Sequence, residues 1–150
     1  MRGLSYSPKS ELLLKAKAQI ESMRSPALAV DTLESLYEQN PNNVGVLIML
    51  SENYRKAGQP KKALELFRNN TLDSSMKESI EFKREKMAVL WDMGEDKEAE
   101  KLYEESIQQS DNPAILLERI QRVNSPEEIN RLYWQWADYH PEVSTRILGA

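Results

Sequence analysis

The stretch LIMLSENYRKAGQPKKALELF, residues 47–67, decides the fold of this chain. Its apolar side chains, Leu50 and Tyr54 among them, are three and four residues apart, which places them on one face of a helix. That run stops at Gly58, and glycine is typical just past a helix end because the chain there usually needs a positive φ. Pro60 begins the next helix, since proline fixes φ and lacks the N–H that a first turn leaves unpaired. The stretch therefore predicts a helix, a tight turn and a second helix.

The two helices carry a pattern of large and small side chains that suits close packing. Ala63 is small enough to let the second helix approach the first, while Tyr54 and Phe67 fill the space on either side. In type and spacing the stretch resembles a tetratricopeptide (TPR) repeat, through Leu50, Tyr54, Gly58, Ala63 and Phe67. None of these five positions implies a catalytic residue.

The same pattern recurs on both sides of this stretch. Thirty-six residues later, Tyr54, Gly58, Ala63 and Phe67 are answered by Leu90, Gly94, Ala99 and Tyr103. Thirty-four residues earlier, Tyr54, Pro60, Ala63 and Phe67 are answered by Ile20, Pro26, Ala29 and Leu33. Ser25, Pro26 and Pro41 are also repeated 100 residues later, by Ser125, Pro126 and Pro141. A constant shift across several positions indicates a repeat more strongly than any single match.

The resemblance implies an all-α fold, in which seven to eight helices form a TPR-like right-handed superhelical stack of antiparallel pairs. We expect a single domain over residues 1–150, with three full repeats and a shortened fourth. Their approximate bounds are 8–43, 44–75, 76–112 and 113–141. The tail, residues 142–150, is expected to be a final helical turn or the stump of a further unit.

Local signals predict where each helix begins and ends. We expect helices over residues 8–23, 26–39, 44–57, 60–69, 76–93, 96–109, 114–123 and 126–139. Ser7 and Ser25 are expected N-caps, and Ser75 and Ser125 are expected to begin capping boxes. The buried side of the first helix is expected to comprise Leu12, Leu13, Ala16, Ile20 and Met23.

Composition and charge argue against several classes of protein. A net charge of −4 makes nucleic acid an unsuitable partner, because binding to phosphate is driven by basic patches. The chain has no apolar run of the roughly 18 to 20 residues that a membrane-spanning helix needs, so we expect a soluble protein without direct membrane insertion. The N-terminus lacks the apolar core of a secretory signal, which leaves a cytoplasmic protein or a mature or excised domain of an exported one. The absence of cysteine excludes disulfides and thiolate metal sites.

Catalytic constellations are not found in the sequence, so we expect no enzyme, no cofactor and no metal. The single histidine, His140, precedes a proline at a helix end and has no sequence-local partner, so a capping or solvated role is expected. Adjacent acids such as Glu104 and Glu105 do not make the separated carboxylate pair that acid–base catalysis needs. The five glycines never cluster into a phosphate-binding loop.

Function must then come from a surface. In stacked helix pairs the first helix of each pair lines the concave face, and this face is expected to bind a protein or peptide partner. The predicted concave-face residues are Leu14, Ile48, Met49, Glu52, Arg55, Arg84, Ala88, Trp91 and Gln121. The alternative is that these side chains only complete the core, since an error of one residue in register exchanges the two sets.

The C-terminal helix is unusually aromatic, with Leu132, Tyr133 and Trp136 expected on its buried side. Trp134 and Tyr139 do not share that stripe and are predicted to be sites of self-association. They are expected to be covered by the tail from Val143 to Leu148, by a further repeat, or by a second copy in a homodimer. Two functions follow: a scaffold or adaptor that binds a partner, or an assembly segment of a longer repeat array.

Overall fold

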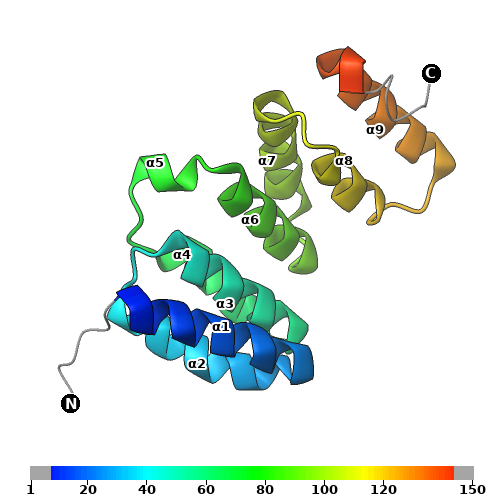
Figure 1. Ribbon diagram of the computed structural model, residues 1–150. Helices are drawn as coiled ribbons and strands as arrows, with labels where there is room; N and C mark the ends of the chain where they lie inside the picture. The colour runs from blue at the N-terminus through cyan, green and yellow to red at the C-terminus, as the bar shows by residue number, and fades with distance from the viewer. Residues whose placement is uncertain (1–7, 144–150) are drawn as a thin grey trace. The chain divides into compact units, whose positions relative to one another are not determined.

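The computed structural model describes residues 8–143, and every regular element in that part of the chain is an α-helix (Figure 1). The predicted all-α class is thus confirmed. The helices are α1 (Pro8–Arg24), α2 (Pro26–Gln39), α3 (Val44–Lys56), α4 (Pro60–Asn69), α5 (Ser74–Lys77), α6 (Ile80–Asp92), α7 (Asp96–Gln109), α8 (Pro113–Ile120) and α9 (Pro126–Tyr139). Residues 141–143 are also helical, while Ser7 and the rest of the predicted tail lie outside the described residues.

The predicted long helix over residues 76–93 is wrong, because the chain breaks it into α5 and α6. Asp73, and not Ser75, caps α5 by accepting a hydrogen bond from the Met76 N–H at 3.0 Å. Ser79 then caps α6 by accepting from the Phe82 N–H at 3.2 Å. A second good N-cap within the run lets the chain restart a helix, and this adds one helix to the seven or eight expected.

The turns at Gly58 and Gly94 have the same structure. Gly58 and Gly94 have φ angles of 78° and 76°, a region that favours glycine. After each glycine the next N–H donates to the carbonyl five residues before it, at 2.7 Å from Gln59 to Tyr54 and 2.8 Å from Glu95 to Leu90. Each glycine N–H also donates to the carbonyl three residues before it. This pattern is a Schellman motif, repeated after the 36 residues seen in the sequence.

The chain divides into two compact units, Met1–Asp96 and Lys97–Ala150. In the first unit α1 packs on α2, α2 on α3 and α3 on α4, while α6 packs against both α3 and α4 (Figure 1). The pattern residues Ala29, Leu33, Ala63 and Phe67 are buried in one core, as predicted. An edge-to-face contact between Phe67 and Phe82, with ring centroids 5.0 Å apart, joins α4 to α6.

The predicted buried side of α1 is wrong. Leu12, Leu13, Ile20 and Met23 are 68%, 64%, 61% and 87% exposed, and Ala16 is exposed as well. Ala18, on the other side of the helix, is fully buried instead. Ser25, between α1 and α2, makes no side-chain cap; its backbone carbonyl accepts from the Leu28 N–H at 3.1 Å.

The second unit contains α7, α8 and α9, of which α8 packs against α9. Its buried side chains include Tyr103, Ile107, Ile115, Leu132 and Trp136. His140 ends α9: its ring lies 4.5 Å from that of Trp136, and its Nε2 lies within hydrogen-bond distance of the Ile107 carbonyl. The helices of residues 8–143 include none that is both long enough and apolar enough to cross a membrane.

Candidate functional site

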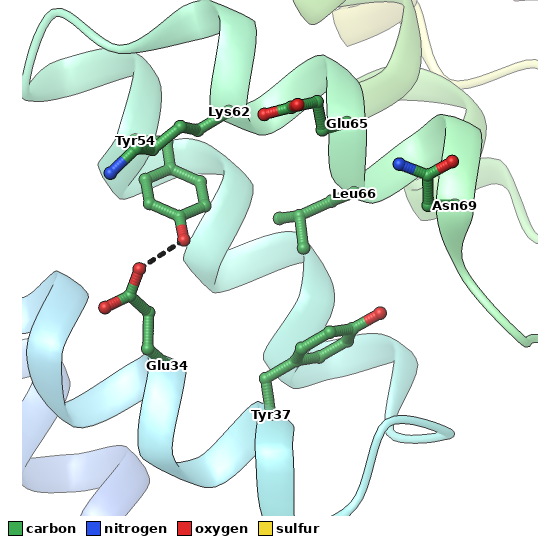
Figure 2. Close-up of a pocket in the computed structure, with 7 residues that line it drawn as sticks. All are labelled: Glu34, Tyr37, Tyr54, Lys62, Glu65, Leu66 and Asn69. Atoms are coloured by element: carbon green, nitrogen blue, oxygen red, sulfur yellow. Dashed lines mark hydrogen bonds between the residues drawn. The ribbon is translucent and has the colours of Figure 1, made fainter.

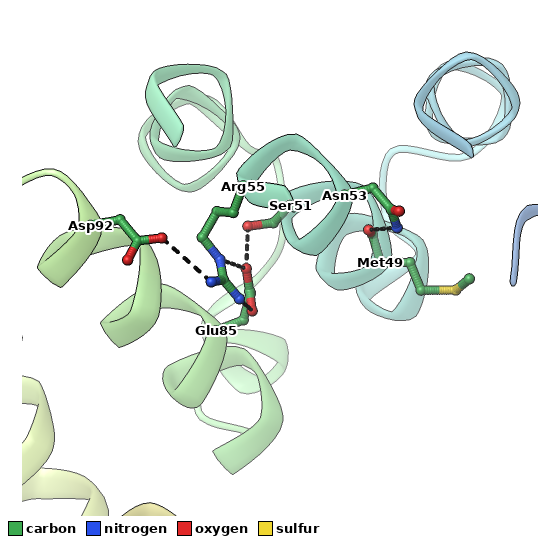
Figure 3. Close-up of polar contacts among 6 residues, drawn as sticks. All are labelled: Met49, Ser51, Asn53, Arg55, Glu85 and Asp92. Carbon is green, nitrogen blue, oxygen red and sulfur yellow. Dashed lines mark hydrogen bonds and ion pairs between the residues drawn. The ribbon is translucent and has the colours of Figure 1, made fainter. Parts of the chain in front are cut away.

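A polar network joins α3 to α6 inside the first unit (Figure 3). The Glu85 carboxylate is its centre and is only 6% exposed. Arg55 donates to both Glu85 oxygens, from Nε at 2.8 Å and from Nη2 at 2.7 Å. Ser51 donates to Glu85 Oε2 at 2.7 Å, and the Arg55 guanidinium also reaches Asp92 at 3.4 Å. Two parallel bonds of this kind fix the geometry as well as the charge pairing.

The network favours the charged form of Arg55 and holds the two helices together. Burial alone would lower the pKa of Arg55, but the hydrogen bonds and negative charge of Glu85 outweigh it, so the pKa is raised. A buried carboxylate left without this partner would be strongly unfavourable. Arg55 was predicted to contact a partner, but it bonds to residues of its own chain. We therefore assign it a structural role beneath the predicted concave face.

Glu52 lies half-buried one helical turn from Ile48 and Arg55 on α3. Its pKa is raised, mainly by burial and next by the charge of Glu85. Glu52 is therefore the acid of this face whose environment opposes ionisation.

The structure brings most of the predicted concave-face residues into the first unit. Spacings of three and four residues align Ile48, Glu52 and Arg55 on α3, with Met49 beside them. The same spacings align Arg84, Ala88 and Trp91 on α6, next to the Glu85 side that contacts α3. All seven are half-buried, as is Leu14 on α1. Gln121 is exposed after α8 in the second unit, so it is not grouped with them.

The predicted site residues did not include Glu85, the centre of the network, or Ser51 and Asp92, which complete it. Ser51 precedes Arg55 by one helical turn, and Asp92 follows Glu85 by two. These spacings indicate shared helix faces, but neither shows that the two faces meet. Asn53, also missed, links α1 to α3: its Oδ1 accepts from Ser22 at 2.7 Å, and its Nδ2 donates to the Met49 carbonyl at 2.8 Å (Figure 3).

A separate pocket of about 310 Å³ opens where α2 meets α3 and α4 (Figure 2). The Tyr54 hydroxyl donates to Glu34 at 2.5 Å, and the Lys62 ammonium lies 5.8 Å from the centre of the Tyr54 ring. Burial, followed by the hydrogen bond to Glu34, raises the pKa of Tyr54 well above its ordinary value. The phenol therefore stays protonated at neutral pH and serves as a tie between helix pairs.

The described residues include no group of three or more histidine, cysteine or acidic side chains placed to hold a metal ion. Comparisons of the chain with protein-family models, with curated proteins and with solved structures gave no match. The TPR resemblance therefore rests on the residues quoted above, and the function must be argued from the surfaces of this molecule.

Proposed function

We propose that the chain is a non-catalytic scaffold that binds a peptide or helix of a partner protein on the inner face of its first unit. The inner face is defined by Leu14, Ile48, Met49, Glu52, Arg84, Ala88 and Trp91. The observation that carries the proposal is the α3–α6 network, because it fixes two adjacent helices while leaving their neighbouring side chains half-buried. A face built this way is preorganised, which reduces the entropy cost of binding.

The chemistry of the inner face suits a mixed apolar and charged ligand. Ile48, Met49 and Trp91 offer apolar contact area, and methionine adapts easily to irregular surfaces. Arg84 and Glu52 supply charges of both signs. Binding to such helix faces usually depends on a few apolar anchors flanked by polar contacts, and we assign the anchor role to Met49 and Trp91.

We propose, as part of the same function, that the helix pairs are arranged as in a TPR domain. A TPR-like right-handed stack is supported by the two matching Schellman turns and by the burial of Ala29, Ala63 and Ala99. Small residues at these positions allow close helix approach in each pair. We also propose that the protein needs no cofactor, because the buried charged pair beside the inner face, Arg55 and Glu85, bonds within the chain.

Capture experiments on the intact chain would test the proposal. The immobilised wild-type protein is expected to retain a partner from an extract of its source cells, and Met49→Ala combined with Trp91→Ala is expected to lose it. Lys61→Ala, an exposed change on α4, is the matched control. Melting curves decide the alternative: if Met49 and Trp91 belong to the core, the double change should cost roughly 2 to 5 kcal/mol for each side chain. An identical set of captured proteins from all three variants would refute the binding face.

A further inference from the structure

Among the residues that the structure describes, α1 makes its contacts with other helices on one side. Lys17 and Glu21 both bond to Thr32 of α2, and Ser22 bonds to Asn53 of α3. The opposite side exposes Leu13 and Ile20, which are seven residues apart and so share a face. Leu12 and Met23, at the edge of this face, are still more exposed. Four large apolar side chains on one exposed helix side indicate an interaction surface.

Helix α3 shows which neighbour α1 lacks. On one side α3 meets α2, where Tyr54 bonds to Glu34. On another side it meets α6, through Ser51 and Arg55. An inner helix of the first unit therefore has the preceding helix pair on one side and the following pair on the other. Helix α2 covers one side of α3, and no corresponding helix covers the exposed side of α1 in the described part of the chain.

Helix α9 resembles α2 in its length and its ends, 100 residues later, although only Ser125 caps its helix through the side chain. Both have 14 residues, a serine at the N-cap and proline in the first turn. Both end at a residue of similar conformation, with φ and ψ of −146° and 84° at Asn40, and −137° and 65° at His140. In each, that residue donates its N–H to the carbonyl four residues before it, at 3.1 Å and 2.9 Å. Leu36 and Trp136, which supply those carbonyls, are both buried.

The same shift of 100 residues relates the outer sides of the two helices. Glu34 of α2 contacts the next helix pair, because it accepts the hydrogen bond from Tyr54 of α3. The corresponding residue of α9 is Trp134, which is 55% exposed and packs edge-on against Tyr133, with ring centroids 5.3 Å apart. Helix α9 thus has a large aromatic side chain at the position where α2 contacts α3.

The charges of the two helices favour α1 against α9 over either helix against itself. Helix α1 has four basic and two acidic side chains, a net charge of +2. Helix α9 has one basic and three acidic side chains, a net charge of −2. Two copies of α1, or two copies of α9, would bring like charges together, whereas α1 and α9 are complementary.

We propose that copies of this chain associate head to tail, with Leu13 and Ile20 on α1 of one copy packed against Trp134 on α9 of the next. The contact repeats between copies the way in which α3 packs on α2 within the first unit. It uses the side of α1 away from Leu14 and the inner face, so it does not depend on the proposed partner binding. Because the two surfaces differ, such a contact does not close in a symmetric dimer and continues to larger species or a ring.

Sedimentation of the full chain, across a range up to high micromolar concentration, tests this directly. The wild type is expected to form species larger than a dimer. Ile20→Glu blocks the α1 side and Trp134→Lys blocks the α9 side, and each should weaken association about tenfold or more. Both side chains are more than half exposed, so the helical circular dichroism should not change. Should Ile20→Glu unfold, Leu13→Glu tests the same side.

A mixture of the two variants separates this arrangement from symmetric dimers. The Ile20→Glu copy keeps its α9 surface, and the Trp134→Lys copy keeps its α1 surface, so the equimolar mixture is expected to regain the association that each variant alone has lost. Tyr139→Lys is the matched control, because Tyr139 is 49% exposed on the same helix but five residues from Trp134, on another face. A monomeric wild type, association by either variant alone, a mixture that stays monomeric, or an equal loss in Tyr139→Lys would overturn the proposal.

Discussion

Helices α1 and α3 are both the first helix of a pair, and similar apolar patterns predict similar burial for them. In α3, Leu47 and Leu50 are buried, whereas in α1, Leu13 and Ile20 are exposed. The turns that follow differ. Three residues separate α3 from α4, including Gly58 with its positive φ, but Ser25 alone separates α1 from α2. Each added helical residue rotates the next side chain by about 100°, so the two turns set different rotations, and within residues 8–143 α1 also lacks the preceding helix pair that α3 has.

The comparison shows what a repeat pattern leaves open. The matching residues fix which positions are apolar and where the second helix of each pair begins. They do not fix the rotation of the first helix, because rotation depends on the number of residues that the turn takes. The turn at Gly94 matches the turn at Gly58 in every bond that defines the motif, while the turn at Ser25 has none of them.

The largest expected effect is on the core of α3. Leu50→Ala should lower the free energy of unfolding by about 2 to 5 kcal/mol, because the side chain is 1% exposed and leaves a cavity. Leu13→Ala in α1 should change it by less than about 0.5 kcal/mol, because that side chain is 64% exposed. Urea unfolding of both variants measures the difference. A similar loss in the two would mean that α1 is buried as its pattern predicts.

Helix ends were the most predictable part of the fold. The predicted bounds of α2, α4 and α7 agree with the structure at both ends. Prolines mark the start of α2 and α4, and Asn40 before Pro41 marks the end of α2. The break before Ile80 was not predicted, because Asp73, Ser75 and Ser79 all suit an N-cap and the sequence alone does not show that Asp73 and Ser79 both serve as one.

The candidate site was predictable in its helix faces only. Ile48, Glu52 and Arg55 share a face of α3 by spacing alone. The pairing of Arg55 with Glu85 joins residues 30 positions apart and depends on how α6 meets α3. The packing of the helices therefore decides whether a side chain can contact a ligand or is bonded within the chain. The spacing of residues in the sequence does not show this packing.

A smaller effect is expected at the turns. Gly58→Ala should cost about 1 kcal/mol, because alanine is strained at a φ of 78° although no atom lies within 4 Å of the added carbon. Ser25→Ala should cost clearly less, because the Ser25 hydroxyl makes no cap hydrogen bond and its φ is −159°. Thermal unfolding compares the two variants. Equal losses would contradict the distinction drawn between the turns.

The smallest effect is the opposite pH dependence of one acid on each helix. Burial raises the pKa of Glu52 in α3, whereas the hydrogen bond from Thr32 lowers the pKa of Glu21 in α1. Compared with Glu52→Gln, the wild type should lose stability as pH rises above the ordinary value of 4.5. Compared with Glu21→Gln, it should lose stability as pH falls below 4.5.

Unfolding curves of the three proteins, recorded at several pH values, measure both trends. The difference from Glu52→Gln should shrink or reverse in the acid range, and the difference from Glu21→Gln should grow toward neutral pH. Differences that keep the same sign and slope for both acids would show that Glu52 is as well solvated as Glu21.

The hydrogen bonds from Ser51 and Arg55 to Glu85 also affect how cooperatively the helices of the first unit unfold. In repeat arrays, stability is approximately the sum of each unit and its contacts with its neighbours, so strong contacts make adjacent units open together. Helices α3 and α6 share this buried network, whereas α1 is held by its contacts on one side. The middle of the first unit should therefore open as one block, and α1 should exchange its amide hydrogens at a lower opening free energy, as the fraying end of that block.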